Sequence, residues 1–134
     1  MPSELEWNFA ASGGAEQRVY PWKAPDSGPS ITSSDANYGN SNPGPVAVGS
    51  TPPGDGRWGQ CDLAGNVIEW ALDYYGDYPA ECKDCLISTP AVERVQRGGA
   101  YPMDESLLVS SFRTSSDPSM TRSFFGFRCA HDLK

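Results

Sequence analysis

The chain has 134 residues with 17 acidic and 10 basic side chains, which gives a formal net charge of −7. This length suits one domain with a modest core. Negative charge repels phosphate backbones and anionic lipid, so nucleic acid is not expected as a partner. The chain has no apolar stretch of roughly 18 residues and no basic-then-apolar signal pattern. We therefore expect no membrane span, and any export signal would lie upstream of Met1.

The first residues predict a short helix over residues 4–11. Ser3 and Glu6 have the spacing of a capping box, in which each side chain accepts a hydrogen bond from the backbone N–H of the other residue. Gly13 and Gly14 follow the apolar residues of this segment. They are expected to stop the helix.

Fourteen Gly and twelve Pro favour short strands and many loops over long helices. Residues 25–53 are rich in Ser, Gly, Asn and Pro, a composition typical of turns. Only Val46 and Val48 interrupt this segment, as a candidate short strand. Because Trp and Tyr residues flank the segment, we expect a loop that lies on the core, with a linker as the alternative.

A strand, or a bent extended stretch, is predicted over residues 67–75. This segment carries Val, Ile, Trp, Leu and two Tyr, which are residue types that strands favour. Further short strands are predicted near residues 93–97, 106–113 and 125–130. No repeat of fixed period appears, which excludes solenoids and propellers.

Large aromatic side chains are expected to hold the core together, since each supplies a large apolar surface. The aromatic residues expected in this role are Trp58, Trp70, Tyr74 and Tyr75. Gly98 and Gly99 follow Arg97 and allow the backbone to turn where a side chain would clash.

Four blocks of the sequence resemble the formylglycine-generating enzyme (sulfatase-modifying factor) family in their order and spacing. They are MPSELEWNFAASGG at 1–14, GRWGQCDLAGNVIEWALDYY at 56–75, RVQRGGAY at 94–101 and GFRCA at 126–130. The resemblance implies a loop-rich α+β fold related to C-type lectins, with short strands and few helices. Family members usually carry roughly another hundred residues before the first block. Residues 1–134 are therefore expected to form the C-terminal portion of such a domain, as a truncated, processed or assembled piece.

The DLAGNVIEW segment suggests a calcium site. The carboxylates of Asp62 and Glu69 bracket a Gly-containing turn, and the carbonyls of Gly65 and Val67 are candidates to complete the oxygen ligands that calcium requires. The resemblance adds weight, because the matching family motif holds a structural calcium ion through these positions. The competing interpretation is that Asp62 forms an Asx turn and Glu69 pairs with an arginine.

Two other residues belong to this hypothesis. Asn66 is expected to support the turn through side-chain hydrogen bonds. The resemblance also implies a second calcium site near Asn37, although the following loop is short and the usual downstream acidic ligand has no clear counterpart.

The resemblance implies an oxidase activity, but this chain lacks the cysteines that hold the metal for that activity. Family oxidases oxidise a sulfatase cysteine with oxygen and a copper ion, and two thiolates between the RGG and GFRCA blocks hold that soft metal. The interval from Arg97 to Arg128 contains no cysteine, and Met103 stands close to the first expected position. His131 is the only histidine, and one imidazole does not make a facial triad for iron. We therefore expect no copper and no catalytic residue.

Cys82 and Cys85 have a spacing shared by zinc knuckles, redox motifs and tight disulfide loops. The other cysteines are spaced wrongly for a zinc ribbon. The acidic neighbours Glu81 and Asp84 would raise the thiol pKa, which is unfavourable for a redox motif. We favour a structural disulfide, which implies an oxidising compartment, extracellular or periplasmic.

The state of Cys129 stays open at this point. In the family, the corresponding cysteine often pairs with one upstream of the first block, and here that partner would precede Met1. The alternatives are a disulfide between Cys129 and Cys61, or a free buried thiol.

Together these observations predict a non-catalytic, calcium-stabilised structural or binding module of an exported protein. Its 102–125 loops would present a surface to a protein, peptide or glycan. The candidate residues of this surface are Arg113, Asp117, Arg122 and Phe124. An upstream half-domain or another chain is the expected partner. A variant of this hypothesis is the variable-protein branch of the family, which diversity-generating retroelements alter in the same region.

The alternative function is an enzyme. It would be a divergent metal-dependent oxidase or modifying enzyme that residues upstream of this chain complete. A lesser possibility is a piece that stabilises a larger exported protein without any ligand.

Overall fold

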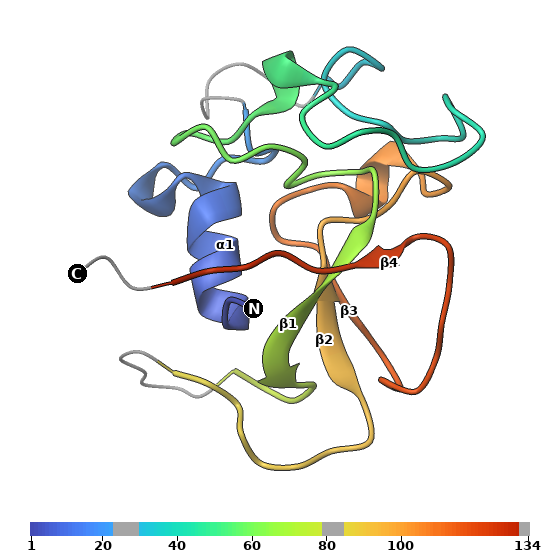
Figure 1. Ribbon diagram of the computed structural model, residues 1–134. Helices are drawn as coiled ribbons and strands as arrows, with labels where there is room; N and C mark the ends of the chain where they lie inside the picture. The colour runs from blue at the N-terminus through green and yellow to red at the C-terminus, as the bar shows by residue number, and fades with distance from the viewer. Residues whose placement is uncertain (23–29, 79–84, 132–134) are drawn as a thin grey trace.

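A computed structural model describes residues 1–22, 30–78 and 85–131 of the chain. Figure 1 shows the α-helix beside a small curled sheet, with turns and loops at both ends of the sheet. The helical elements are α1 (Glu4–Ser12), η1 (Gly14–Glu16), η3 (Pro52–Gly54) and η4 (Glu105–Leu107). The strands are β1 (Ile68–Tyr74), β2 (Arg94–Arg97), β3 (Arg113–Ser116) and β4 (Phe125–Gly126). None of these helices has the length and apolar character to cross a membrane.

Helix α1 begins with the capping box that the sequence predicts. The Ser3 side chain accepts a hydrogen bond from the Glu6 N–H, and the Glu6 carboxylate accepts one from the Ser3 N–H at 2.7 Å. The helix ends at Gly13, whose φ of 67° is left-handed. A left-handed cap favours glycine because it has no Cβ to clash.

The sheet has the order β3-β2-β1-β4. β2 pairs antiparallel with both β1 and β3, while β4 pairs parallel with β1. β1 and β2 confirm the strands expected over 67–75 and near 93–97, and β4 lies inside the expected segment 125–130. The pairing of β1 with β2 is irregular between Trp70 and Tyr74.

The strand expected near residues 106–113 is wrong. Residues 105–107 form η4, and β3 begins only at Arg113. The reason is that the Arg97 guanidinium donates hydrogen bonds to the carbonyls of Ser110, Ser111 and Phe112. Carbonyls gathered around one cation do not form a strand ladder, in which they would accept bonds from a neighbouring strand.

The turn-rich segment covers the core over its described part, residues 30–53. Ile31 and Ala36 are buried in one hydrophobic cluster, which confirms the covering loop and excludes a free linker there. Residues 25–29 lie outside the described ranges. Val46 and Val48 form no strand, because the backbone N–H and C=O of Val46 bond to the Asn66 side chain.

The core consists of two clusters of buried side chains. One contains Tyr20, Ile31, Ala36, Ala64 and Leu108, and the other contains Trp7, Ala11 and Leu63. The interpretation of Trp58 and Tyr75 as core residues is wrong, since both side chains are exposed. Trp70 and Tyr74 are only half-buried. Aromatic rings with a polar edge are stable at the surface as well as in a core, so composition does not distinguish the two.

Gly98 and Gly99 make the tight turn that the sequence predicts. Both have left-handed φ values, of 92° and 66°. A Cβ at Gly99 would lie 2.6 Å from the Leu107 carbonyl oxygen. The turn therefore requires glycine on steric grounds as well as conformational ones.

A buried ion cluster joins α1 to the sheet. The Glu4 carboxylate accepts two hydrogen bonds from Arg113, at 2.7 and 2.8 Å, and lies 3.6 Å from Arg97. The side chains of Glu4 and Arg97 are each 1% exposed. The Tyr78 hydroxyl also donates to Glu4, and partial burial together with this hydrogen bond raises the pKa of Tyr78. Asp73 completes the contact by accepting from the Glu4 N–H at 2.6 Å.

Replacing Glu4 by Gln should destabilise the fold by about 3 kcal/mol, because it leaves two guanidinium groups without their buried counter-charge. Urea unfolding monitored by Trp fluorescence measures the change. The control is Glu16→Gln, which alters the part-exposed pairs with Arg18 and Arg57 and should cost less than about 1 kcal/mol. Equal losses in the two variants would contradict this account.

Candidate functional site

The turn before β1 is sharply folded and buried on one side. Asp62, Gly65 and Asn66 all have left-handed φ values, of 54°, 79° and 61°. The Gly65 N–H donates to the Gly98 carbonyl, and the Asn66 N–H donates to the Asn37 carbonyl, each at 2.9 Å. A Cβ at Gly65 would lie 2.5 Å from the Asn37 oxygen. The predicted calcium turn is therefore locked against two distant segments.

Asn66 supports this turn as expected. Its amide oxygen accepts from the Val46 N–H at 2.9 Å, and its amide nitrogen donates to the Val46 carbonyl at 3.2 Å. The Asn66 side chain thus bonds to both backbone groups of Val46, as a neighbouring strand would, and holds the covering loop against the turn.

Glu69 is engaged by an arginine, as in the competing interpretation. Arg128 donates to both carboxylate oxygens, at 2.6 Å each, and the Trp7 indole N–H donates to one of them at 2.8 Å. Such a bidentate, charge-assisted pair is among the strongest hydrogen-bonded contacts in proteins. A calcium ion at Glu69 would have to compete with this guanidinium.

The Asp62 carboxylate accepts fewer hydrogen bonds than that of Glu69. One of its carboxylate oxygens accepts from the Gly49 N–H at 2.8 Å. Over the described ranges, no three His, Cys, Asp or Glu side chains converge on a point that would hold a metal ion. The oxygen set of the first predicted site is thus one available carboxylate, Asp62, together with the candidate carbonyls of Gly65 and Val67.

Asn37, the residue of the second predicted calcium site, is buried, and its side chain forms hydrogen bonds within its own loop. Its amide oxygen accepts from Ser41 and Asn42, at 3.2 Å each, and its amide nitrogen donates to the Gly44 carbonyl at 3.0 Å. The side chain therefore shapes the loop over residues 37–44.

The region of the family's copper ligands has a packing role in this chain. Met103 is half-buried against the cluster that contains Tyr20 and Leu108.

Cys61 and Cys129 are free thiols, so the disulfide considered between them is wrong. Cys129 is exposed, which also overturns the free buried thiol. Cys82 lies outside the described residues, so its disulfide with Cys85 stays a prediction.

The four residues expected on a recognition surface have different surroundings. Arg113 binds Glu4 and lies over the rings of Tyr75 and Tyr78, at 4.6 and 4.4 Å from their centroids. This arginine therefore belongs to the internal ion cluster. Phe124 is half-buried, with its ring edge-on to that of Phe125.

Asp117 and Arg122 lie in the loop between β3 and β4. The Asp117 carboxylate accepts from the Ser119 N–H at 2.8 Å. This hydrogen bond lowers the pKa of Asp117. Arg122 is exposed and donates to the neighbouring Thr121 carbonyl, so these two residues are the polar part of the predicted surface that faces solvent.

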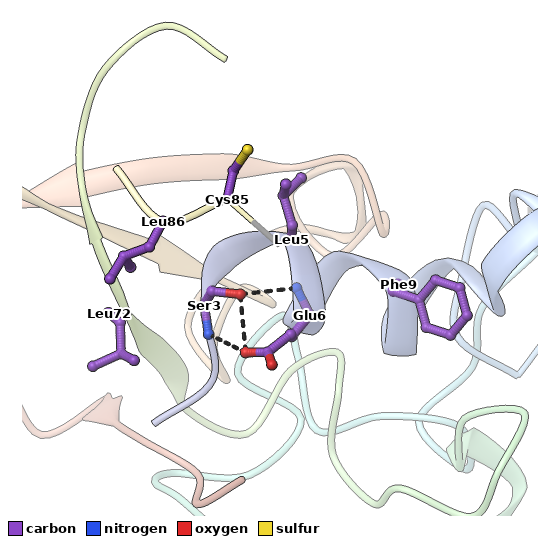
Figure 2. A pocket seen from close by; sticks show the side chains of 7 residues that line it. All are labelled: Ser3, Leu5, Glu6, Phe9, Leu72, Cys85 and Leu86. Carbon is purple, nitrogen blue, oxygen red and sulfur yellow. Dashed lines mark hydrogen bonds between the residues drawn. The ribbon is translucent and has the colours of Figure 1, made fainter. Parts of the chain in front are cut away.

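A groove of about 490 Å³ lies beside α1, and the sequence-based predictions did not include it. Figure 2 shows Leu5 and Phe9 projecting from the helix, with Leu72 of β1 and Leu86 nearby. Leu5 and Phe9 are four residues apart and so share a helix face. The sequence contains a sign of this exposed stripe. Trp7 and Ala11 are also four residues apart, so the helix has two apolar stripes, and the stripe of Trp7 and Ala11 is the one that is buried.

The chain matches one protein family over almost its whole length. The family described as sulfatase-modifying factor enzyme 1-like domain matches residues 1–133. The chain belongs to this family, which confirms the resemblance read from its four blocks.

Particular relatives fall into several functional classes. The chain is 37% identical to serine/threonine-protein kinase Pkn1 of Chlamydia trachomatis, covering 100% of this chain and 21% of the kinase. It is 28% identical to the mouse formylglycine-generating enzyme, covering 98% and 39%. It is 30% identical to hercynine oxygenase of Mycolicibacterium smegmatis, covering 99% and 33%. The chain therefore spans well under half the length of each of these relatives.

Two solved structures share the fold. Variable protein 1 of Treponema denticola superposes with a TM-score of 0.78 at 27% identity, covering 95% of this chain and 45% of that protein. PvdO from Pseudomonas aeruginosa superposes with a TM-score of 0.76 at 26% identity, covering 95% and 50%. Few helices and a curled mixed sheet of short strands are thus features of a formylglycine-generating-enzyme-like fold.

Cys61 should be a slow nucleophile for its exposure. The thiol donates a hydrogen bond to the Asp55 carboxylate, and this bond, together with partial burial and the charges of Asp55 and Asp62, raises the pKa of Cys61. A raised pKa means less thiolate at pH 8, and thiolate is the reactive form. We expect Asp55→Asn to speed alkylation of Cys61 by iodoacetamide about three- to tenfold.

Peptide mass spectrometry of timed samples measures this rate, with the exposed Cys129 as an internal reference. Asp77→Asn, which removes an exposed carboxylate, is the matched control and should leave the rate unchanged. Equal rates for Cys61 in the wild type and in Asp55→Asn would refute the role of Asp55.

Proposed function

We propose that this chain is a non-catalytic, formylglycine-generating-enzyme-like module that serves a structural or ligand-binding role in an exported protein. The observation that carries the proposal is the lack of any cysteine between Arg97 and Arg128. Copper(I) chemistry needs soft thiolate ligands. This interval offers only two thioethers, of Met103, which packs against the core, and of Met120, which is exposed. The loop-rich surface and a relation to C-type lectins are part of the same proposal.

The charged groups near the family's active region support this function. Arg97 donates to three backbone carbonyls and to Asn8, while Arg113 and Arg128 bind buried carboxylates. Cys61 has a raised pKa, which opposes the deprotonation that metal binding by a thiol requires. These side chains therefore stabilise the fold and are poorly suited to acid–base or redox chemistry.

The binding surface in this proposal is the loop between β3 and β4. Asp117 and Arg122 supply opposite charges there, and Phe124 supplies an aromatic ring at the end of the loop. A protein, peptide or glycan is the ligand class that suits such a mixture of polar and aromatic groups. Export to an extracellular or periplasmic compartment follows from the proposed disulfide between Cys82 and Cys85.

Calcium enters the proposal at the turn over residues 62–69. Asp62 and the carbonyls of Gly65 and Val67 would be its ligands, and Glu69 would join them by giving up part of its contact with Arg128. Because that contact must be weakened, we expect the low affinity typical of extracellular modules, in the range of about 10⁻⁴–10⁻³ M. The ion would stabilise the turn and supply no chemistry.

A second candidate function is an enzyme that residues upstream of this chain complete. The resemblance to hercynine oxygenase favours it, because that name describes an oxygen-dependent activity. His131 is the single imidazole that this chain offers to a metal, so the remaining ligands would come from elsewhere in the polypeptide.

An oxidation assay separates the two candidates. The natural polypeptide, supplied with copper(I) and oxygen, should convert no cysteine of a sulfatase-type peptide to an aldehyde, as followed by mass spectrometry. Appearance of the aldehyde would refute the non-catalytic function. An assay of oxygen consumption with iron(II) and a thiol substrate tests the oxygenase alternative in the same way.

Calcium should raise the melting temperature of the chain. At ten times the dissociation constant, binding to the folded state contributes about 1.4 kcal/mol, which is a shift of roughly 4 °C for a domain of this size. Thermal unfolding with CaCl2 or with EDTA measures the shift. Asp62→Asn should abolish the shift and Asp77→Asn should keep it, whereas an equal shift in both variants would place the ion elsewhere.

A further inference from the structure

A polar cavity of about 270 Å³ lies between the second half of α1 and the segment over residues 109–111. Three segments of the chain line it, with the residues Asn8, Ser12, Gln17, Arg18, Val19, Val109, Ser110 and Ser111. The calcium turn and the loop between β3 and β4 contain none of these residues. Sites for drug-sized ligands measure roughly 300–1,000 Å³, so this cavity suits a smaller molecule.

Hydrogen bonds join the three walls of the cavity to one another. The Ser110 N–H donates to the Val19 carbonyl at 2.7 Å, and the Ser110 hydroxyl donates to the Ala11 carbonyl at 3.0 Å. The Arg18 N–H donates to the Ser12 carbonyl at 2.8 Å. The fold itself therefore holds the cavity in shape, and a preformed site loses little conformational entropy when it binds a ligand.

The walls also contain polar groups that the fold leaves without a hydrogen bond. Nδ2 of Asn8, Nη2 of Arg18 and the hydroxyl of Ser111 donate to no atom of the described residues, although Oδ1 of Asn8 and Nε and Nη1 of Arg18 are bonded. The Gln17 amide donates to the Gly14 carbonyl at 2.9 Å, and its oxygen accepts no bond from the described chain. The lining residues therefore offer three donors and one acceptor to a ligand.

The cavity carries positive charge within an acidic chain. Arg18 and Arg57 share the single carboxylate of Glu16, at 2.6 and 2.9 Å, so these three side chains have a net charge of +1. Of the described residues that line the cavity, none is acidic. The Arg18 side chain is 14% exposed, and partial burial strengthens the attraction between its guanidinium and an anion.

Two valines give the cavity an apolar part. Val19 is 43% exposed, and Val109 is half-buried. A ligand with a short aliphatic group would remove this apolar surface from water, which favours binding. The cavity therefore combines one guanidinium, neutral donors and an aliphatic wall.

We propose that this cavity binds a small aliphatic carboxylate. The guanidinium of Arg18 would hold the carboxylate, with Asn8 and Ser111 as further donors. The Gln17 amide oxygen would accept a hydrogen bond from a hydroxyl or ammonium group on the adjacent carbon. A branched 2-hydroxy acid or 2-amino acid meets all of these requirements. The proposal requires neither calcium nor the absence of catalysis.

Saturation-transfer difference NMR of the natural polypeptide with 2-hydroxyisovalerate tests the proposal. We expect saturable binding, and weaker binding of the neutral 2-hydroxyisovaleramide, because the amide lacks the charge that Arg18 would recognise. A lack of saturable binding of 2-hydroxyisovalerate up to about 10 mM, or equal affinity for the acid and its amide, would overturn the proposal.

Two matched variants locate the site. Arg18→Gln should weaken the binding of 2-hydroxyisovalerate at least about tenfold, since hydrogen bonds to charged groups are stronger than neutral ones. Arg57→Gln is the control, because Arg57 also binds Glu16 and a backbone carbonyl but lies outside the lining of the cavity. Its affinity should stay within about threefold of the wild type. Equal affinities in the two variants would place the ligand elsewhere and refute the proposal.

Ser111→Glu gives a readout that keeps the contacts of Arg18 intact. Ser111 is exposed, so the substitution should change the melting temperature by no more than about 2 °C. The new carboxylate should abolish binding of 2-hydroxyisovalerate, because like charges repel at this distance. Wild-type affinity in the folded Ser111→Glu variant would contradict the proposal as well.

Discussion

Two buried carboxylates, Glu4 at the start of α1 and Glu69 in β1, hold the helix against the sheet. Each is bound by two hydrogen bonds from one guanidinium, Arg113 for Glu4 and Arg128 for Glu69. These contacts connect residues far apart in the sequence, so the first helix, the central strand and the last described segment depend on one another. In a small domain with few regular elements, such directional contacts replace part of the stabilisation that a larger apolar core would provide.

The same contacts limit the chemistry of the chain. A carboxylate saturated by a guanidinium is a poor general base and a poor metal ligand, because proton or metal binding would have to displace the arginine. Arg97 is likewise occupied by backbone carbonyls, and a hydrogen bond to Asp55, partial burial and neighbouring carboxylates raise the pKa of the Cys61 thiol. In the described residues these side chains are therefore engaged in contacts that stabilise the fold.

Local signals in the sequence predicted the local structure well. The capping box of Ser3 and Glu6 and the apolar run of β1 depend on neighbouring residues, and both have the expected bounds within one residue. The burial of Glu4 was not predictable, since an acidic residue in the first turn of a helix usually faces solvent. The turns that replace the strand expected near residues 106–113 were missed as well, because they depend on the Arg97 guanidinium, whose partners lie 13 to 15 residues away. Pairings at that separation leave no periodic pattern.

The chain belongs to the sulfatase-modifying factor family, and its interior is stabilised by ion pairs that join α1 to the sheet. Leucines and stacked aromatic rings are exposed beside α1. The central claim is that charged and sulfur-bearing groups here serve structure and binding. Metal analysis of the natural polypeptide, purified without chelators, tests this claim most directly. The account predicts neither copper nor iron in stoichiometric amount, and one equivalent of either metal that persists through dialysis would contradict it.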